Sequence, residues 1–270
     1  MWLNPFQVRS NHTYDSPQSV KCSDLHIKYK DFLAVENLTG TFSAGSLTAI
    51  VGPNGGGKST LLKAIKGVMP ASKGRIEYGD LSSRHDIAYL PQASNVDRSF
   101  PLYASDVVAM GLSTSTGFFK RVSSVDQDRI ALAMDRVQLK DSLSKPIHAL
   151  SGGQFQRLLF ARLSLQDAPV VLLDEPFAAI DAPTMDILAQ LLCDWRDEGK
   201  TVIAVLHDLD IVREFFPSTL ILARRCIAWG RTDQVLQLKN IRQAKDSMCQ
   251  WSFNPDIICP VVPDAAAAVG

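Results

Sequence analysis

The segment GPNGGGKST, residues 52–60, follows directly after the short apolar run LTAIV at 47–51. It fits the pattern G-x-x-x-x-G-K-[S/T] through Gly52, Gly57, Lys58 and Ser59. This pattern is typical of a loop that binds phosphate between a buried strand and a helix. Glycines let successive backbone N–H groups point at an anion, and the N-terminus of the following helix adds about half a positive charge. We therefore interpret residues 52–60 as a phosphate loop rather than a flexible turn.

Two carboxylates in VVLLDEP, residues 170–176, fit the chemistry of such a loop. Asp174 ends a predicted buried strand, and ligands gather at the carboxyl ends of parallel strands. Asp174 could therefore hold Mg²⁺ through water. Pro176 turns the chain, so Glu175 can point at a γ-phosphate and orient or deprotonate the attacking water. Two carboxylates could also merely cap a turn, but the phosphate loop favours the catalytic interpretation.

Three short runs of apolar, β-branched residues, at 47–51, 170–174 and 201–207, predict strands that are buried on both faces, as in a parallel sheet. The alternating pattern LHIKY at 25–29 predicts a half-buried strand. Helical patterns lie between the strands, which favours an α/β layer fold. One of them covers residues 126–143. Because the first two buried strands lie far apart, we expect a mostly helical subdomain over residues 93 to about 165.

Composition excludes several classes of protein. The 270 residues carry 28 basic and 28 acidic side chains, which argues against a chain that binds nucleic acid over its whole length. No apolar run approaches the roughly 18 residues that a membrane-spanning helix needs, and the start does not resemble a secretion signal. Five scattered cysteines predict free thiols in a reducing cytoplasm. We expect residues 1–21 to form a flexible arm and residues 246–270 a tail.

The pentapeptide LSGGQ, residues 150–154, indicates a second site for an anion. Ser151 is a typical helix N-cap residue. The N–H groups of Gly152 and Gly153 open the helix, so they direct the positive end of its dipole at a negative group. One chain cannot easily fold two such sites onto one γ-phosphate from opposite sides, whereas two chains placed head to tail can. The pattern therefore predicts a homodimer as the active state.

Together these motifs resemble those of ABC transporter ATPase subunits, over residues from about 22 to 240 and in the order that the family uses. The matching segments are the Walker A loop (52–60), the signature motif (150–154, followed by Gln156 and Arg157) and the Walker B motif (170–175). The matching single residues are Tyr29 for the adenine-stacking aromatic, Gln92 for the Q-loop, Asp181 for the D-loop and His207 for the switch histidine.

The resemblance implies an α/β fold: a P-loop NTPase (RecA-like) core with a mainly parallel sheet, an N-terminal antiparallel β part and an inserted helical subdomain, within an ATPase domain over residues 22–245. Two copies would sandwich two ATP molecules, each held by the Walker A loop of one chain and the signature motif of the other. The nucleotide-binding residues that it implies are Tyr29, Gly52, Pro53, Asn54, Gly55, Gly56, Gly57, Lys58, Ser59, Thr60, Ser151, Gly152, Gly153, Gln154 and Asp181.

The resemblance also assigns catalytic and metal-binding roles. Ser59, Gln92 and Asp174 would surround Mg²⁺, and the catalytic residues would be Glu175 as general base, His207 on the γ-phosphate, and Gln92. Each of these residues alone is weaker evidence for a functional role than the whole set. Gln92 is a polar residue after a proline, a lone histidine at a strand end is more often structural, and Tyr29 fits a core aromatic equally well. Their joint placement supports the assignment.

Two positions depart from the family pattern. Gly56 stands where the family usually has Ser, Ala or Cys; this adds about 0.5–1 kcal/mol of unfolded-state entropy relative to Ala but removes no phosphate donor. The sequence AAID at 178–181 replaces the commoner SALD, so a hydroxyl that might bond across the dimer is lost. We expect both to leave ATP binding intact, although either could alter turnover.

The region after Gln92 faces the membrane subunit in this family. It carries apolar side chains that could form a groove for a partner helix, or could belong to the subdomain core: Phe100, Leu102, Tyr103, Phe118 and Phe119. The amino-acid sequence of this region resembles that of the ATPases of importers for metal ions, chiefly zinc and manganese, and for iron chelates. We therefore expect an ATPase on the inner, cytoplasmic face of the cell membrane, acting with an integral membrane permease and indirectly with a substrate-binding protein. The histidines and cysteines show no ligand spacing, so we predict no transition-metal site.

The sequence disfavours two other classes of protein. A soluble ABC protein of DNA repair would insert a long coiled coil before the signature motif, and one of translation would carry two cassettes; this chain has neither. A phosphate-loop kinase is disfavoured because it has no use for a signature motif that acts in a second chain. Co-purification with a membrane partner would support transport, and monomeric phosphotransfer would support the kinase.

Overall fold

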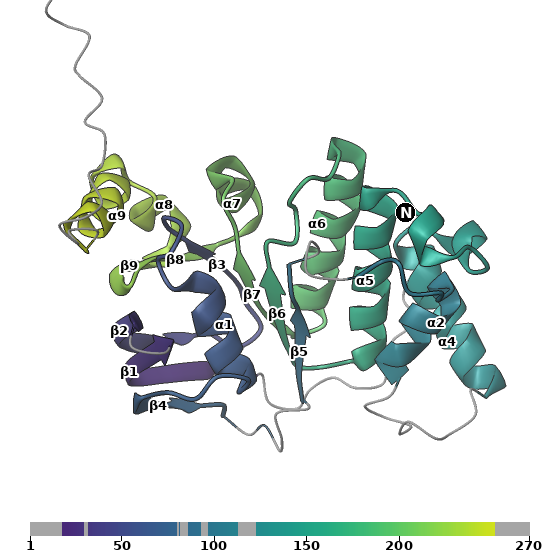
Figure 1. Cartoon of the computed structure of the whole chain (residues 1–270), viewed down its shortest axis with the longest axis horizontal. Coiled ribbons are helices and arrows are strands. Elements are labelled where there is room, and N and C mark those ends of the chain that lie inside the picture. Colours follow the sequence, from purple (N-terminus) through teal and green to yellow (C-terminus); the bar gives the residue numbers. More distant parts are fainter. Residues whose placement is uncertain are drawn as a thin grey trace, which may run out of the picture.

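The fold is given by a computed structural model, which describes residues 18–29, 32–79, 81, 86–92, 97–112 and 123–251. A six-stranded sheet forms its centre, and helices lie on both of its faces (Figure 1). A smaller three-stranded sheet lies outside the helical layer on one of these faces (Figure 1). The large sheet runs in the order β5-β6-β7-β3-β8-β9. All neighbouring strands are parallel except β8 and β9, which are antiparallel. This arrangement confirms the predicted α/β class with its mainly parallel sheet.

The three apolar runs form the middle of this sheet, as predicted. They are β3 (Leu47–Val51), β6 (Val170–Asp174) and β7 (Thr201–Val205), and every residue in them is buried. β-Branched and leucine side chains suit strands that are covered on both faces. The outer strands are β5 (Ile87–Leu90), β8 (Ser218–Ala223) and β9 (Arg225–Arg231).

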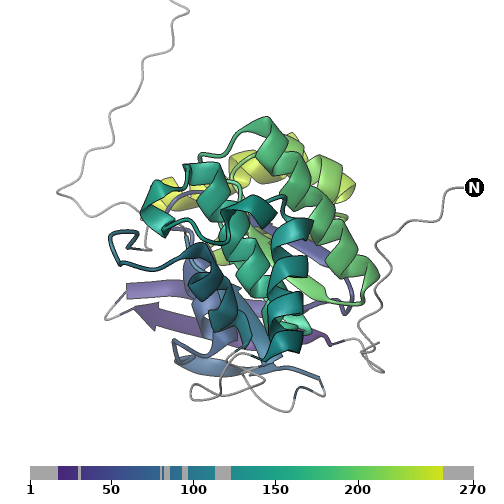
Figure 2. The same cartoon turned by 90° about the vertical axis from the view of Figure 1, so that its right-hand side faces the viewer.

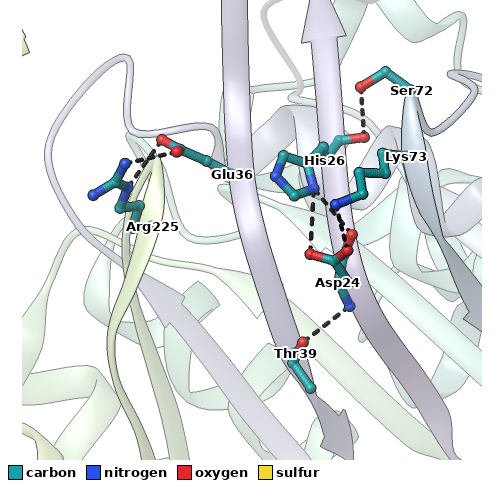
Figure 3. Close-up of polar contacts among 7 residues, drawn as sticks. All are labelled: Asp24, His26, Glu36, Thr39, Ser72, Lys73 and Arg225. Atoms are coloured by element: carbon teal, nitrogen blue, oxygen red, sulfur yellow. Dashed lines mark hydrogen bonds and ion pairs between the residues drawn. The ribbon is translucent and has the colours of Figure 1, made fainter.

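The smaller sheet is antiparallel, in the order β2-β1-β4, and consists of β2 (Phe32–Phe42), β1 (Val20–Tyr29) and β4 (Lys73–Glu77). Asp24 ties all three strands, because its backbone N–H donates to Thr39 Oγ1 at 2.9 Å and its carboxylate pairs with Lys73 at 2.8 Å (Figure 3). Glu36 accepts two hydrogen bonds from Arg225 of β9, at 2.9 and 2.6 Å. This bidentate pair fastens the small sheet to the edge of the large one.

Helix α1 (Lys58–Lys66) lies between the two sheets (Figure 1). Its buried side chains Leu61, Leu62 and Ile65 share one apolar cluster with residues of β1, β2 and the large sheet. The helix ends at Gly67, whose φ of 80° is the left-handed conformation of a helix C-cap. The phosphate loop is therefore held by a strand and a helix that are both packed in the core.

The opposite face of the large sheet is covered by α5 (Gly152–Gln166) and α6 (Ala182–Asp197) (Figure 1). Their contact includes stacked rings of Phe160 and Trp195, with centroids 5.7 Å apart. Farther out, α2 (Ala104–Ala109) and α4 (Ser124–Arg136) pack on α5, so the described part of residues 93–165 is mainly helical, as predicted (Figure 2). Three short 3-10 turns complete it: η3 (Met110–Leu112), η4 (Lys140–Ser142) and η5 (Ile147–Ala149).

The helix predicted over residues 126–143 is shorter than expected. Helix α4 begins after the N-cap Ser123 and ends at Arg136. Gln138 has a φ of 55°, a left-handed conformation that cannot continue a right-handed helix. Val137 and Leu139, which follow α4, are buried and belong to the same core cluster as Met134. Neither of them is part of a helix. Periodicity alone did not show where the helix stops.

The C-terminal part of the chain adds three helices, α7 (Leu209–Phe215), α8 (Thr232–Val235) and α9 (Leu238–Trp251). Regular structure extends past both ends of the predicted 22–245 domain, because β1 begins at Val20 and α9 runs to Trp251. The rest of the predicted arm and tail, residues 1–17 and 252–270, lies outside the described residues. Within the described part of the chain, no helix has the length and apolar character that crossing a membrane requires.

Candidate active site

The phosphate loop and the residues predicted to be catalytic or metal-binding lie at the ends of four neighbouring strands of the large sheet. The phosphate loop follows β3, Asp174 ends β6, His207 follows β7, and Gln92 follows β5. Because these strands are parallel and adjacent, their carboxyl ends lie along one edge of the sheet. Residues that are far apart in the sequence are therefore brought together without any long loop.

Lys58 holds the phosphate loop in a closed curve. Its Nζ donates to the backbone oxygens of Gly52 and Pro53, both at 2.9 Å. The side chain is 6% exposed, and this burial lowers the pKa of the Lys58 ammonium below its ordinary value, while the charges of Glu175 and Asp174 oppose the change. The loop thus carries a desolvated positive charge at the start of α1, where an anion is favoured.

Gly56, one of the two departures from the family pattern, has a steric reason in this chain. A Cβ at this position would lie 2.7 Å from the backbone oxygen of Leu222 and 2.9 Å from that of Pro53. Both are shorter than real Cβ contacts, and backbone atoms cannot move aside as a side chain can. The carbonyl of Gly56 also accepts the N–H of Arg224 at 2.8 Å. The extra glycine allows this close approach of the loop to β8.

Ser59 and Asp174 meet directly. Ser59 Oγ donates to Asp174 Oδ1 at 2.8 Å, and the hydroxyl of Tyr89 donates to Asp174 Oδ2 at 3.4 Å. Burial raises the pKa of Asp174, the neighbouring charge of Glu175 adds to the rise, and the bond from Ser59 opposes it. Burial also raises the pKa of Tyr89, helped by Asp174. The site therefore places a desolvated carboxylate and a hydroxyl side by side.

Glu175 is held from two sides. Gln92 Nε2 donates to Glu175 Oε2 at 2.8 Å, and His207 Nε2 donates to Glu175 Oε1 at 2.7 Å. The backbone of Glu175 is left-handed, with a φ of 53°, which is unusual for a residue other than glycine and is found at functional sites. The three residues predicted to be catalytic thus form one hydrogen-bonded group. Gln92 contacts Glu175, and its predicted place beside the metal stays a prediction.

An open cavity of about 310 Å³ lies over the phosphate loop. It is lined by the loop residues 54–60, Glu175, Ala34, Tyr29 and Phe32. The Tyr29 side chain is more than half exposed, so it is not a core aromatic. Phe32 is 48% exposed, and the guanidinium of Arg224 lies 4.0 Å from the centre of its ring. The cavity is thus lined both by aromatic side chains and by the phosphate loop.

The signature segment, residues 150–154, opens α5 as predicted. Ser151 is the N-cap, its Oγ accepts the N–H of Gln154 at 3.2 Å, and Gln154 Oε1 accepts the N–H of Ser151 at 3.0 Å. This reciprocal capping box is typical of a stable helix start. Asp181 is the N-cap of α6, because its Oδ1 accepts the N–H of Thr184 at 3.1 Å. The residues of the signature segment are not among the described residues that line the cavity.

Sequence reasoning missed three residues of this site: Tyr89, Phe32 and Arg224. Tyr89 stands three residues before Gln92 on the strand that pairs with β6, so a correct strand order would have placed it near Asp174. Phe32 follows Tyr29 closely on the next strand of the small sheet. No sequence signal marks Arg224, whose contact with Phe32 depends on the turn between β8 and β9.

Known proteins share this architecture. A profile for the ABC transporter family matches residues 35–178. The manganese transport system ATP-binding protein of Listeria monocytogenes is 38% identical over 223 residues, which cover 82% of this chain and 93% of that protein. The zinc transport system ATP-binding protein of Treponema pallidum is 40% identical over 215 residues, which cover 78% of this chain and 81% of that protein.

Solved structures agree with the sequence relatives. A protein described as a metal-chelate type ABC transporter, in an inward-facing conformation, superposes with a TM-score of 0.76 at 28% identity, covering 85% of this chain and 89% of that one. A dimeric bacterial ABC transporter cassette gives a TM-score of 0.69 at 26% identity, covering 79% of this chain and 98% of that one. The chain therefore belongs to the ABC transporter family and carries the ATPase domain of that family.

Proposed function

We propose that the chain is the ATPase subunit of a metal-ion importer, and that two copies hydrolyse ATP at their shared interface. The observation that carries this proposal is the separation of two anion-binding elements within one chain. The phosphate loop lines the cavity, whereas the signature segment begins a helix whose first residues, Ser151 and Gly152, are exposed and do not line it. A second copy, placed head to tail, would bring its signature segment to the open side of the cavity.

Within one such site, Lys58 would leave the carbonyls of Gly52 and Pro53 and bind the outer phosphates, where its charge is worth more than in water. Tyr29 would stack on the base. Glu175 would accept a proton from the attacking water at a carboxylate oxygen, and His207 and Gln92 would hold that carboxylate in place. Asp181, at the start of α6, would face the partner chain.

The side chains of Ser59 and Asp174 fit a magnesium site. Both are oxygen ligands, they are already 2.8 Å apart, and Mg²⁺ in nucleotide sites is bound by one or two carboxylates plus phosphate oxygens. Gln92, whose amide lies on Glu175 one residue after Asp174, could supply a further oxygen. The ion would neutralise charge that develops on the phosphates. Burial raises the pKa of Asp174, and a bound cation would offset this burial by stabilising the charged carboxylate.

Replacing Gly152 by alanine tests the head-to-tail arrangement. Among the described residues, no heavy atom other than those of its chain neighbours and of the α5 backbone lies within 4 Å of a Cβ at this position, so the methyl group fits within one chain. Alanine should also stabilise the first turn of α5, by up to about 1 kcal/mol. We expect an unchanged or higher Tm and at least a tenfold fall in ATPase activity, about 1.4 kcal/mol of lost transition-state binding, because the methyl group would meet the partner's nucleotide. Wild-type activity in Gly152→Ala would contradict a signature segment that acts in the partner site.

The proposed membrane partner is an integral permease, which would dock on the helical subdomain. Phe100 and Tyr103 are 63% and 53% exposed and stand three positions apart in the sequence, and exposed apolar patches mark interaction sites. Leu102 instead packs on the core, and Phe118 and Phe119 lie outside the described residues. This surface would place the subunit on the cytoplasmic face of the membrane, with a substrate-binding protein delivering cargo on the other side.

Manganese or zinc is the proposed cargo, because the relatives at 36–40% identity are named for transport of these metals. Import of an iron chelate is the second candidate, favoured by the likeness to a metal-chelate type transporter. The test is the metal content of cells that lack the chain and of cells that regain the wild type or Glu175→Gln. We expect cellular manganese or zinc to fall and to be restored by the wild type only. Unchanged manganese and zinc with reduced iron would favour the chelate, and no change in any metal would contradict both.

A further inference from the structure

The second turn of α5 contacts two different parts of the molecule through consecutive residues. Arg157 Nη1 donates to the backbone oxygens of Val137 and Gln138, at 3.1 and 3.3 Å, just after the end of α4. Gln156 Nε2 donates to the backbone oxygen of Pro176, at 2.7 Å, in the loop that follows β6. One turn after the signature segment, the helix is therefore bonded both to the helical subdomain and to the loop that carries Glu175.

Gln156 is buried, with an exposed fraction of 3%. A buried amide is normally kept because its polar atoms have partners. Here the Nε2 group has Pro176, whereas Oε1 accepts no hydrogen bond from any described residue. Pro176 itself is buried and, as a proline, can contribute only its carbonyl. Packing alone would favour an apolar side chain at 156, so the hydrogen bond to the loop is the feature that requires glutamine.

The loop needs support because the backbone of Glu175 is left-handed, with a φ of 53°. Such a conformation persists only where its surroundings hold it. The N–H of Glu175 donates to the oxygen of Val205 at 3.1 Å, and the oxygen of Glu175 accepts the N–H of Ala178 at 3.2 Å. These two bonds come from the neighbouring strand and from the loop itself. Among the hydrogen bonds described for this loop, the bond from Gln156 is the one that comes from α5, so it ties the orientation of Glu175 to the position of that helix.

We propose that Gln156 is a positioning residue, which transmits the placement of the signature segment to Glu175 of the same chain. It does not contact the nucleotide. The inference rests on the proposed head-to-tail dimer, in which the signature segment of one chain binds the nucleotide of the other. Loading of one site would shift α5, and through Gln156 would align the general base of the second site. The two sites of the dimer would thereby hydrolyse ATP cooperatively.

The first test is Gln156→Met in the full-length chain, with Gln190→Met as the matched control. Met has nearly the shape of Gln but no donor, and Gln190 is an exposed residue of α6 whose amide donates to Asp194 of the same helix at 3.0 Å. We expect kcat for ATP to fall about tenfold or more, as misplaced catalytic groups cause, with KM within about twofold of wild type. The Hill coefficient for ATP should fall toward one, and Gln190→Met should match the wild type. A wild-type kcat in folded Gln156→Met would overturn the proposal.

The second test, Gln156→Glu, uses pH, so that its result is a trend within one variant. A carboxylate at this position repels the oxygen of Pro176, but a protonated carboxyl group can donate to it. Burial raises the pKa of such a group, so it should take up a proton near neutrality. We expect the kcat of Gln156→Glu, divided by that of the wild type at each pH, to rise as the pH falls from about 8 to about 6. A ratio that does not change with pH would overturn the proposal.

A double variant separates this inference from the proposed function. If Gln156 acts only through Glu175, then Gln156→Met should leave the residual ATPase rate of Glu175→Gln unchanged. A further fall by the same factor as in the wild type would show that Gln156 acts elsewhere and would overturn the proposal. These ATPase rates do not depend on the cargo or on the permease. If Glu175→Gln itself retained wild-type activity, the general base would be wrong, which is a failure of the proposed function and not of this link alone.

Discussion

Glu175→Gln should bind ATP normally, hydrolyse it about a thousandfold more slowly than the wild type, and accumulate as an ATP-bound dimer. General-base catalysis contributes roughly 10²–10⁴-fold, and an amide cannot accept the proton of the attacking water. Binding should survive because the phosphate loop and Tyr29 are untouched. The dimer should persist because opening would require hydrolysis.

The hydrogen bonds around Glu175 make this substitution conservative. The new amide oxygen can accept from His207 Nε2, which donates to the carboxylate at 2.7 Å. The new NH₂ group would then face Gln92, whose own amide can rotate by half a turn and present its oxygen. Loss of activity would therefore report on proton transfer rather than on collapse of the site.

The measurements are single-turnover hydrolysis, nucleotide affinity and the oligomeric state in ATP by size-exclusion chromatography. Glu214→Gln provides a control, because Glu214 is an exposed glutamate of α7, away from the cavity. It should behave as the wild type in all three. Wild-type turnover in Glu175→Gln would remove the assignment of Glu175 as base, and a monomer in ATP would contradict trapping by slow hydrolysis.

The buried strands and the motifs at their ends could be predicted from the sequence because both are local. LTAIV, VVLLD and the start of TVIAVLH are strands in which every residue is buried, as their composition required. The strand–loop–helix order around Lys58 and the N-cap Ser151 also follow from neighbouring residues. Parallel strands then place the motifs at one edge, so much of the site was implied by the fold class.

Contacts that depend on strand order and turn geometry could not be predicted. Gln92 and Glu175 are 83 positions apart, and they meet only because β5 pairs with β6. The left-handed backbone of Glu175 has no sequence signal, since neither glycine nor asparagine stands there. The bond from Gln156 to Pro176 requires the packing of α5 on the sheet. These long-range contacts decide how the catalytic carboxylate is aimed.

Lys58→Ala should lose about ten- to a hundredfold in ATP affinity, with only a small change in stability. A hydrogen bond to a charged group contributes about 1.5–3 kcal/mol, and 1.4 kcal/mol corresponds to a factor of ten in affinity. Lys58 Nζ donates to the backbone oxygens of Gly52 and Pro53. Both residues are half-buried, so water can reach their oxygens after the substitution. We therefore expect the free energy of unfolding to fall by about 1 kcal/mol at most.

Two further variants separate charge from packing in this prediction. Lys58→Met keeps the aliphatic stem, which is buried against the loop, and should lose as much ATP affinity as Lys58→Ala if the ammonium is what binds phosphate. Lys239→Met, at an exposed position of α9, should bind ATP as the wild type does. Isothermal titration with ATP gives the affinities, and thermal unfolding gives the stabilities. Unchanged affinity in both Lys58 variants would mean that the Lys58 ammonium does not bind the triphosphate, because its buried charge, which Glu175 and Asp174 offset in part, would then add nothing to affinity.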